Sequence, residues 1–434
     1  MDDAPFHALT LVAAVEEIAA GTLTARALAA AQLARIAATD GAIEAWAHLD
    51  PAHVAAKARR RDAAPTAERG PLHGIGIGVK DIIGTADLPT ELGTPIYAGR
   101  RPFHDAECVV RLTRAGAYVF GKTVTTEFAF MQPGKTRNPW NARHTPGGSS
   151  SGSAAAVAAG HVAGALGTQT NGSVIRPAAY CGVVGFKPTM GAIPFAGISV
   201  FSRTLDQLGT FTRNVADAAR LASPLADPGR IHAAIAPLAA PPRLACLAGY
   251  PWSAVDAEAG AVLDAAVTRL REHAEVVPVR IPAEWTAANG VLRTIMLFEA
   301  AQEMAALQAR ERARLSAQLN AALDEGRAIA PADYAAALVR RDQAIAAFTD
   351  WSAGFDAILS PAAPGAAPAG LDTTGDPACC TLWSLLGFPA ITIPVGLAGG
   401  LPLGLQLAAL PGADDRLLAV AAWCEAKLPF RGLV

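Results

Sequence analysis

Charge of one sign is the first thing that this sequence lacks. Its 434 residues carry 36 Lys and Arg against 38 Asp and Glu, a formal net charge of -2, and the basic residues are spread along the chain. A protein that binds nucleic acid needs a cluster of cations to neutralise phosphates. The even distribution therefore argues against DNA or RNA as a partner.

Long apolar runs are also missing. The longest ones, at 154–160 and 417–423, fall well short of the ~20 residues that a membrane-spanning helix needs. The first residues, MDDAPFHALT, have neither the basic start nor the apolar centre of a signal peptide. We therefore expect no membrane association and a cytoplasmic location.

Cysteine is scarce, with six residues that form no CxxC pair and have no neighbouring histidine. A disulfide framework or a zinc site needs closely spaced ligands of these kinds. The thiols are therefore expected to be reduced and mostly buried, and no metal or other cofactor is predicted.

The chain is rich in hydrophobic residues, which make up 52% of it, whereas charged residues make up only 17%. This composition is typical of a well-buried globular enzyme. Capping residues predict helices at 11–20 and from 24 to about 41. Short β-type runs alternate with helical stretches from residue 74 onward, at 74–79, 117–120, 244–247, 357–359, 390–395 and 403–407. This alternation predicts an α/β fold with a mixed sheet.

Two stretches match known motifs that their surroundings exclude. GAYVFGKT at 116–123 fits the phosphate-binding loop, but that loop needs a strand before it and a helix after it, whereas here the strand-like run lies inside the motif. GSSSG at 148–152 fits the nucleophile elbow of α/β-hydrolases, but loop residues lead into it in place of a strand. Neither nucleotide binding nor a Ser-His-acid hydrolase is expected.

Lys80 ends a predicted strand whose glycines leave space beside it. In GIGIGVKD, alternation puts Ile75, Ile77 and Val79 on one face and leaves three glycines with Lys80 on the other. Groups that close over the amine would desolvate it and lower its pKa below the ordinary ~10.4, so that it can act as a general base. The alternative is that Lys80 pairs with Asp81 or caps the strand end.

Two loops rich in Gly and Ser follow. TPGGSSSGSAAAVAAG at 145–160 leads into an Ala-rich helix, a pattern that is also typical of a plain linker. In TNGS, the residues Thr170, Asn171 and Gly172 can turn tightly and aim successive backbone N–H groups at one point beside Ser173. Amides aimed in this way form an oxyanion hole, which acyl transfer needs when a carbonyl oxygen becomes charged.

Together, Lys80, the GGSSSGS run and TNGSVIRPA resemble the amidase signature family. GKTVTTEFAF, SRTLDQLGTFTRNVADAA, LLGFPAITIPVG and GLPLGLQL resemble further blocks of this family in the same order. The resemblance implies its fold, a mixed, mostly parallel β-sheet core covered by α-helices on both faces. We expect one domain over 1–434, with a helical N-terminal segment (1–60), a catalytic core (65–225) and the remaining sheet and substrate-site helices (226–434).

The resemblance also implies roles for single residues. Ser173 would be the nucleophile, Ser149 the bridging serine of a cis peptide, and Lys80 the terminal base, with backbone amides of Thr170 to Ser173 as the oxyanion hole. A serine hydroxyl is a poor nucleophile until a base accepts its proton. Neutral Lys80 would therefore take a proton from Ser149, which takes one from Ser173 as Ser173 attacks the amide carbon.

Three positions bear on the substrate. Many family members carry Asp where this chain has Gln169, and Gly or Ala where it has Asn171. Because Asn tolerates the left-handed backbone of a tight turn, the oxyanion hole is expected to remain, and the substrate preference is what these changes put in question. GSVIRPA resembles malonamidase-type members, in which the arginine at the place of Arg176 holds the carboxylate of a small amide acid through its planar fork. A structural arginine is the alternative.

These features predict an amidase that hydrolyses the C–N bond of a small carboxamide through an acyl-enzyme, with a carboxylated substrate such as malonamate or a ureido acid. One alternative is the glutaminase subunit of a tRNA-dependent amidotransferase, which has the same triad and hands ammonia to a partner protein. Another is a non-catalytic scaffold or binding protein of the same fold. The resemblance also leaves a homodimer open.

Overall fold

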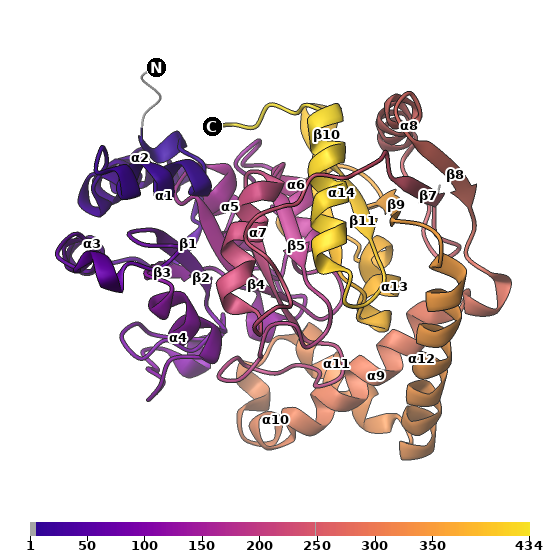
Figure 1. The fold of residues 1–434 in the computed structure, drawn as a ribbon. Helices are drawn as coiled ribbons and strands as arrows, with labels where there is room; N and C mark the ends of the chain where they lie inside the picture. The colour runs from indigo at the N-terminus through magenta and orange to yellow at the C-terminus, as the bar shows by residue number, and fades with distance from the viewer. Residues whose placement is uncertain (1–5, 248) are drawn as a thin grey trace.

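One large sheet runs through the computed structural model, which describes residues 6–247 and 249–434 (Figure 1). Its strand order is β1-β3-β2-β4-β6-β5-β10-β11-β9-β7-β8. The strands are β1 (Trp46–His48), β2 (Gly76–Lys80), β3 (Tyr118–Thr123), β4 (Gly164–Gln169), β5 (Val184–Lys187), β6 (Gln207–Thr212), β7 (Arg243–Leu247), β8 (Glu275–Val279), β9 (Ala357–Pro361), β10 (Ala390–Ala398) and β11 (Leu401–Ala408).

Helices precede, connect and follow these strands. The α-helices are α1 (Leu11–Ala20), α2 (Ala25–Ile43), α3 (Pro51–Asp62), α4 (Glu107–Arg114), α5 (Ser151–Ala158), α6 (Ile175–Cys181), α7 (Val215–Ala222), α8 (Ala257–Arg271), α9 (Ala288–Glu303), α10 (Ala305–Glu311), α11 (Ala317–Ala328), α12 (Pro331–Ser352), α13 (Ala378–Leu386) and α14 (Asp414–Lys427). Single 3₁₀ turns lie at Phe6–Ala8, Thr66–Glu68, Pro95–Tyr97, Glu127–Ala129, Ser223–Leu225, Ala283–Trp285 and Arg312–Arg314.

The first two α-helices begin where the capping residues predict, and α1 also ends there, whereas α2 continues to Ile43, past its predicted end near residue 41. Thr10 and Thr24 each accept a hydrogen bond from a backbone N–H three residues ahead, and Gly21 closes α1 with a left-handed φ of 78°. These side chains satisfy backbone groups that the helix itself leaves unpaired. The predictions of helices at 11–20 and from residue 24 are therefore confirmed.

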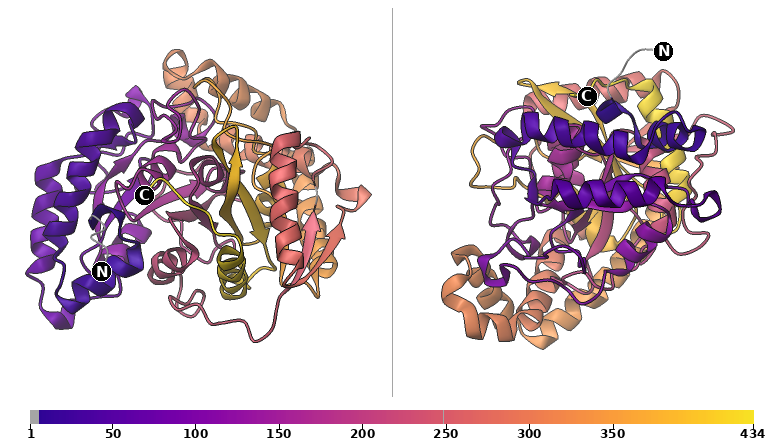
Figure 2. Two further views of the ribbon diagram at one scale, coloured as in Figure 1. Left: turned by 90° about the horizontal axis from the view of Figure 1, so that it is seen from above. Right: turned by 90° about the vertical axis from the view of Figure 1, so that its left-hand side faces the viewer.

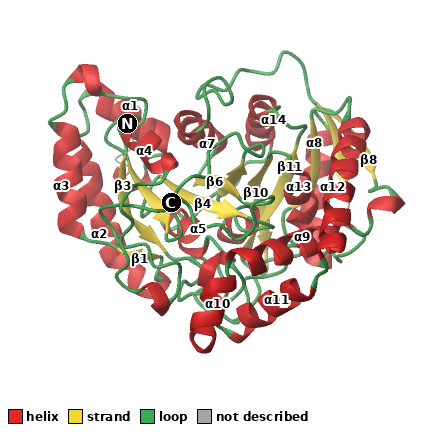
Figure 3. Cartoon of the chain, turned by 90° about the horizontal axis from the view of Figure 1, so that it is seen from below, coloured by secondary structure: helices red, strands yellow, loops and turns green. Residues whose placement is uncertain are grey.

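Helices cover both faces of the sheet, as Figure 3 shows. Helices α7, α14 and α8 contact one another in turn along one face, whereas α5 and α6 pack side by side on the strands of the other. Helices α1, α2 and α3 lie at the β1 end of the sheet and α8 lies at the other end (Figure 2). The group α9 to α12 forms a separate wall at one side of the molecule (Figure 1).

The mixed α/β class is confirmed, but the expectation of a mostly parallel sheet is wrong. Six of the ten neighbouring strand pairs are antiparallel and four are parallel. One reason is the hairpin of β10 and β11, whose two connecting residues, Gly399 and Gly400, both have positive φ. Two such residues allow the tight turn that only antiparallel strands can use.

Of the helices in the described ranges, none has the length and apolar character needed to cross a bilayer. All six cysteines are free thiols, and five of them are buried. The prediction that the thiols are mostly buried is therefore confirmed.

Candidate active site

Lys80 is fully buried at the end of β2, an inner strand that lies between β3 and β4. Its Nζ donates to Ser149 Oγ at 2.7 Å and to Thr168 Oγ1 at 2.8 Å. Burial lowers the pKa of Lys80 to about 7, and the negative charge of Asp206 only partly opposes this shift. A lysine in this state is largely neutral just above pH 7 and can accept a proton.

The glycines of β2 explain how the amine becomes desolvated. A Cβ on Gly76 would lie 2.4 Å from a ring carbon of Phe120, and one on Gly78 would lie 3.1 Å from Thr123 Cγ2. Side chains from β3 therefore close over β2 where a larger residue would hold them away. Water is excluded from this face, and the buried charged form of Lys80 is disfavoured.

Ser149 lies in a loop that is clamped between the sheet and α6. The peptide bond between Gly148 and Ser149 is cis. Beside it, Ser150 Oγ both donates to Thr168 O and accepts from Thr168 N, at 3.2 Å each. Arg176 Nη2 donates to Gly148 O at 2.7 Å. These contacts fix the loop so that the buried Ser149 hydroxyl faces Lys80.

Ser173 lies between β4 and α6, and Gln169 shapes the turn that carries it. Gln169 Oε1 accepts from the backbone N–H groups of Val174 at 2.8 Å and Ile175 at 3.0 Å. Its Nε2 donates to Ser384 Oγ at 3.0 Å, and that hydroxyl in turn donates to Asn171 O. Gln169 thus holds both ends of the turn, because its side-chain amide has an acceptor oxygen for one end and a donor nitrogen for the other.

Asn171 does not use the left-handed backbone that an asparagine tolerates in a tight turn. It does not have a positive φ; its side-chain Oδ1 accepts from Thr381 Oγ1 at 3.0 Å. This contact with α13 replaces the conformational role that the sequence suggested. Asn171 is therefore a tether of the turn to α13.

The turn presents free backbone donors next to Ser173. Within residues 6–247 and 249–434, the N–H groups of Asn171, Gly172 and Ser173 donate to no protein acceptor. In the same described ranges the Ser173 hydroxyl, which is half-buried, has no side-chain partner, so no hydrogen bond joins it to Ser149. Free amides around a serine hydroxyl can stabilise an oxyanion that forms on a carbonyl attacked by that hydroxyl.

A small pocket of about 70 Å³ opens above this turn. Its lining brings together the predicted oxyanion residues, Ser173 and Arg176, and does not include Lys80 or Ser149. Apart from these predicted residues, its lining consists of Ala129, Phe130, Met131, Phe201, Met296, Thr374, Gly375 and Pro377. Its size and largely apolar wall favour a small acyl group.

Arg176 is buried in this pocket with part of its guanidinium unused. Its Nη2 donates to Gly148 O at 2.7 Å and to Thr374 Oγ1 at 3.1 Å. Within the described parts of the chain, Nε and Nη1 have no partner and no carboxylate forms an ion pair with Arg176. Burial lowers its pKa, yet a guanidinium stays protonated at neutral pH. A buried cation with free donors is costly unless an anion joins it.

Sequence reasoning missed Thr168 and Asp206. Thr168 shares the Lys80 amine with Ser149, and Asp206 accepts a hydrogen bond from Thr170 Oγ1 at 2.6 Å. Burial raises the pKa of Asp206 to about 6. A polar residue inside the glycine-rich strand GALGTQ was the only available signal for Thr168, and nothing in the sequence links position 206 to position 170.

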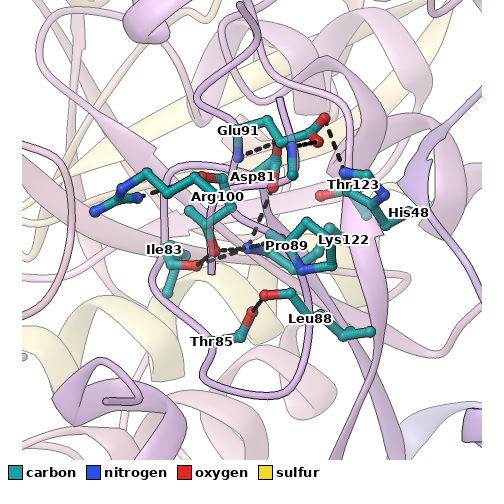
Figure 4. Close-up of polar contacts among 12 residues, drawn as sticks. His48, Asp81, Ile83, Thr85, Leu88, Pro89, Glu91, Arg100, Lys122 and Thr123 are labelled. Atoms are coloured by element: carbon teal, nitrogen blue, oxygen red, sulfur yellow. Dashed lines mark hydrogen bonds and ion pairs between the residues drawn. The ribbon is translucent and has the colours of Figure 1, made fainter. Parts of the chain in front are cut away.

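Lys122, the lysine of the rejected phosphate-loop motif, lies in a buried cluster beside the site (Figure 4). Its Nζ is 3.2 Å from Asp81 Oδ1 and donates to Ile83 O at 2.9 Å, Pro89 O at 3.2 Å and Thr90 Oγ1 at 2.6 Å. The lysine therefore ties the loop after β2 to β3. Asp81 is thus paired with Lys122, and the alternative in which Lys80 pairs with Asp81 is not formed.

The same cluster contains the one group of potential metal ligands found among the described residues. Ligand atoms of His48, Asp81 and Glu91 all lie within 4.8 Å of one another. His48 Nε2 already pairs with Glu91 at 2.9 Å, and Lys122 already pairs with Asp81 (Figure 4). Each of the three groups therefore already has a charged or titratable partner, and we propose no metal site here.

Comparison with known proteins gives consistent results. A model of the amidase family matches residues 27–418. A subunit of the glutamyl-tRNA(Gln) amidotransferase of Roseiflexus castenholzii is 34% identical over 96% of this chain and 95% of its own length. A solved structure described as an amidase superposes with a TM-score of 0.89 at 31% identity, covering 97% of this chain and 100% of its own. The peptide amidase of Stenotrophomonas maltophilia superposes with a TM-score of 0.84 at 30% identity, covering 98% of each chain.

These similarities extend over nearly the whole chain. The Roseiflexus relative carries the name of an amidotransferase component, so it supports the alternative of a glutaminase subunit better than a malonamate hydrolase. The solved structures include amidases, and none of the comparisons tests the carboxylate predicted from Arg176. The family match over 27–418, together with the full-length identity, shows that the chain is an enzyme acting on C–N amide bonds and that it belongs to the amidase family.

Proposed function

We propose that this enzyme hydrolyses a small carboxamide through an acyl-enzyme on Ser173. The observation that carries the proposal is the hydrogen bond between the buried Lys80 amine, with its lowered pKa, and Ser149 Oγ. Neutral Lys80 accepts the Ser149 proton while Ser149 accepts that of Ser173, and Ser173 Oγ bonds to the amide carbon. The C–N bond then breaks, and the proton returns through Ser149 to the departing nitrogen.

The second half of the reaction uses the same groups. A water molecule gives its proton to the Ser149 and Lys80 relay and attacks the acyl-enzyme, and the ester bond to Ser173 breaks to release the acid. In both halves the carbonyl oxygen gains negative charge. The free N–H groups of the turn from Thr170 to Ser173 support an oxyanion hole at this position.

We further propose that the substrate carries a carboxylate, because buried Arg176 lines the pocket that holds Ser173 and two of its guanidinium nitrogens, Nε and Nη1, have no partner among the described residues. A planar guanidinium binds a carboxylate through two parallel hydrogen bonds. A short acid such as malonamate or a ureido acid fits the small pocket. The same donors would also suit the carboxylate of glutamine, which is separated from its carboxamide by three carbons instead of one.

Arg176→Ala is expected to lower kcat/KM for malonamate about 10- to 100-fold, because charge-assisted hydrogen bonds to the substrate are lost. Hydrolysis of propionamide, which lacks the carboxylate, serves as the internal reference. Arg176 also holds Gly148 O, so damage to the loop would slow both substrates equally. Ammonia release from both substrates checks this prediction, and an equal loss on both would assign Arg176 a structural role.

The second candidate function is that of a glutaminase subunit in a tRNA-dependent amidotransferase. It is supported by the identity of 34% to such a subunit over nearly the full length of both chains. The test is ammonia release from glutamine, malonamate and propionamide by the purified chain, with and without the other subunits of an amidotransferase. Glutamine turnover that needs those subunits, with no hydrolysis of malonamate, would replace the first proposal by this one.

A non-catalytic scaffold is the remaining alternative from the sequence. It conflicts with the enzyme class that the family match shows, and the positions of Lys80, Ser149 and Ser173 are all filled. A fluorophosphonate that reacts with active serines provides a direct check. Modification of Ser173, located by peptide mass spectrometry, is the expected result, whereas an unlabelled Ser173 together with no amide hydrolysis would support a scaffold.

The pH profile follows from the lowered pKa of Lys80, which lies at about 7. Only the neutral amine accepts a proton, so activity is present above this pKa and is lost as the pH falls through it. We expect kcat/KM to drop about tenfold for each pH unit well below 7 and to level off above it. Circular dichroism at each pH separates this effect from unfolding, and a profile that stays flat from pH 5 to pH 8 would contradict neutral Lys80 as the base.

A further inference from the structure

The carboxylate of Asp206 joins two segments that meet at the pocket. Its Oδ1 accepts from Thr170 Oγ1 at 2.6 Å, in the turn after β4. Its Oδ2 accepts from the backbone N–H groups of Phe201 at 2.7 Å and Ser202 at 3.1 Å. Thr170 and Phe201 both line the pocket. One buried carboxylate therefore fixes the oxyanion turn relative to an aromatic wall of the pocket.

The segment that follows Phe201 is in turn bonded to the helical wall. Glu299 of α9 accepts from Ser202 Oγ and Thr204 Oγ1, and from Thr204 N at 3.0 Å. Tyr334 of α12 donates its hydroxyl to Glu299 Oε1 at 2.7 Å. Met296, one turn before Glu299 on α9, lines the pocket. A continuous series of hydrogen bonds thus runs from the oxyanion turn to the helices that wall the substrate pocket.

We infer that Asp206 is a positioning residue that holds the Thr170 hydroxyl, and with it the donor amides of the oxyanion turn, in register with the pocket wall formed by Phe201 and α9. The inference rests on the proposed function, because it explains how the proposed oxyanion hole is held in place. Asp206 itself does not touch the substrate. Catalytic donors must be held close to their productive positions, and a shift of ~1 Å can cost about 100-fold in rate. A charged acceptor buried from water gives the strong hydrogen bond that such a task needs.

A purely structural role for Asp206 would need only its contacts with the 201–202 segment. The hydrogen bond to Thr170 does not stabilise that segment. It therefore distinguishes the positioning role from a purely structural one. Removing Asp206 itself would also change the charge that faces Lys80, because Asp206 acts on the Lys80 pKa. Thr170 is therefore the residue to change, since its backbone amide and its size can be kept.

The test is Thr170→Val, which removes the hydroxyl but keeps the shape of the side chain. The matched control is Thr189→Val, because Thr189 Oγ1 donates to the buried carboxylate of Asp414 at 2.5 Å and does not line the pocket. We expect Thr170→Val to lower kcat about 10- to 100-fold with KM changed less than about threefold. The control should lose thermal stability to a similar extent and keep its kcat. Thr170→Ser, which restores the donor, should recover most of the lost kcat.

The rate of fluorophosphonate labelling at Ser173 provides a second readout that needs no substrate. Thr170→Val should slow the labelling, because the phosphonyl oxygen uses the same donor amides. A labelling rate and a kcat equal to those of the wild type, or an equal loss of kcat in Thr189→Val, would overturn the positioning role alone. If Ser173 of the wild-type enzyme is not labelled, the proposed function fails instead, so the two failures are distinguishable.

Discussion

Replacing Ser173 with alanine is expected to abolish amide hydrolysis, with kcat lowered by about four to six orders of magnitude. The change removes the only hydroxyl proposed to bond to the amide carbon, and it leaves the pocket, the free amides and Arg176 in place. Ammonia release from malonamate, glutamine and propionamide measures the effect. Because the side chain has no side-chain partner within the described residues, the variant should unfold at the wild-type temperature.

Ser352→Ala is a suitable control for this prediction. Ser352 is a buried serine whose hydroxyl donates to Phe348 O within α12, and it does not line the pocket. Its loss should leave kcat unchanged. Activity of Ser173→Ala within tenfold of the wild type would exclude Ser173 as the nucleophile and would direct attention to Ser149, which also contacts Lys80.

The sequence was sufficient for the strands whose residues alternate or are strongly apolar. The runs at 117–120, 357–359 and 403–407 lie within β3, β9 and β11 or overlap them by all but one residue. It was not sufficient for the inner strand β4, whose sequence GALGTQ has a low intrinsic preference for a strand. A Cβ on Gly167 would lie 2.6 Å from the ring of Phe211 and 2.7 Å from Ser150 Oγ. The residue that makes β4 hard to predict is thus required by close packing.

The site was predictable where its chemistry is local. The glycines beside Lys80 indicate a buried amine from within one strand, and TNGS indicates a turn with free amides from within one loop. Contacts that depend on the tertiary fold were not predictable, such as Thr170 with Asp206 and Asn171 with Thr381, the latter 210 residues apart. A single sequence carries no record of such pairings.

The roles within the triad, the single domain over 1–434, a homodimer, the cytoplasmic location and the substrate stay predictions. For the substrate, the pattern GSVIRPA alone could not decide whether Arg176 binds a substrate carboxylate or is structural, because the decision depends on which of its nitrogens are free. The pattern gives the residue, but only the fold shows that two of its nitrogens have no partner within the described parts of the chain.

Lys80→Met is expected to lower kcat about 1,000-fold or more, because the relay then has no terminal proton acceptor. Methionine fills a similar space without an amine, so the side chains above β2 can stay packed. The residual activity should also lose the dependence on pH near 7 that the lowered pKa of Lys80 predicts for the wild type. Ammonia release at several pH values, with KM measured at each, checks both parts.

Lys187→Met is the matched control, because this chain offers a second lysine in nearly the same physical state. Lys187 is fully buried on β5, burial lowers its pKa to about 7, and it donates to Gln207 Oε1 at 3.0 Å. It contacts neither Ser149 nor Ser173 in the part of the chain that the structure describes, and it does not line the pocket. Both substitutions remove a buried amine from the sheet, so both should change stability, and only Lys80→Met should change the chemistry. An equal loss of kcat in the two variants would mean that a damaged sheet, and not a missing base, explains the effect.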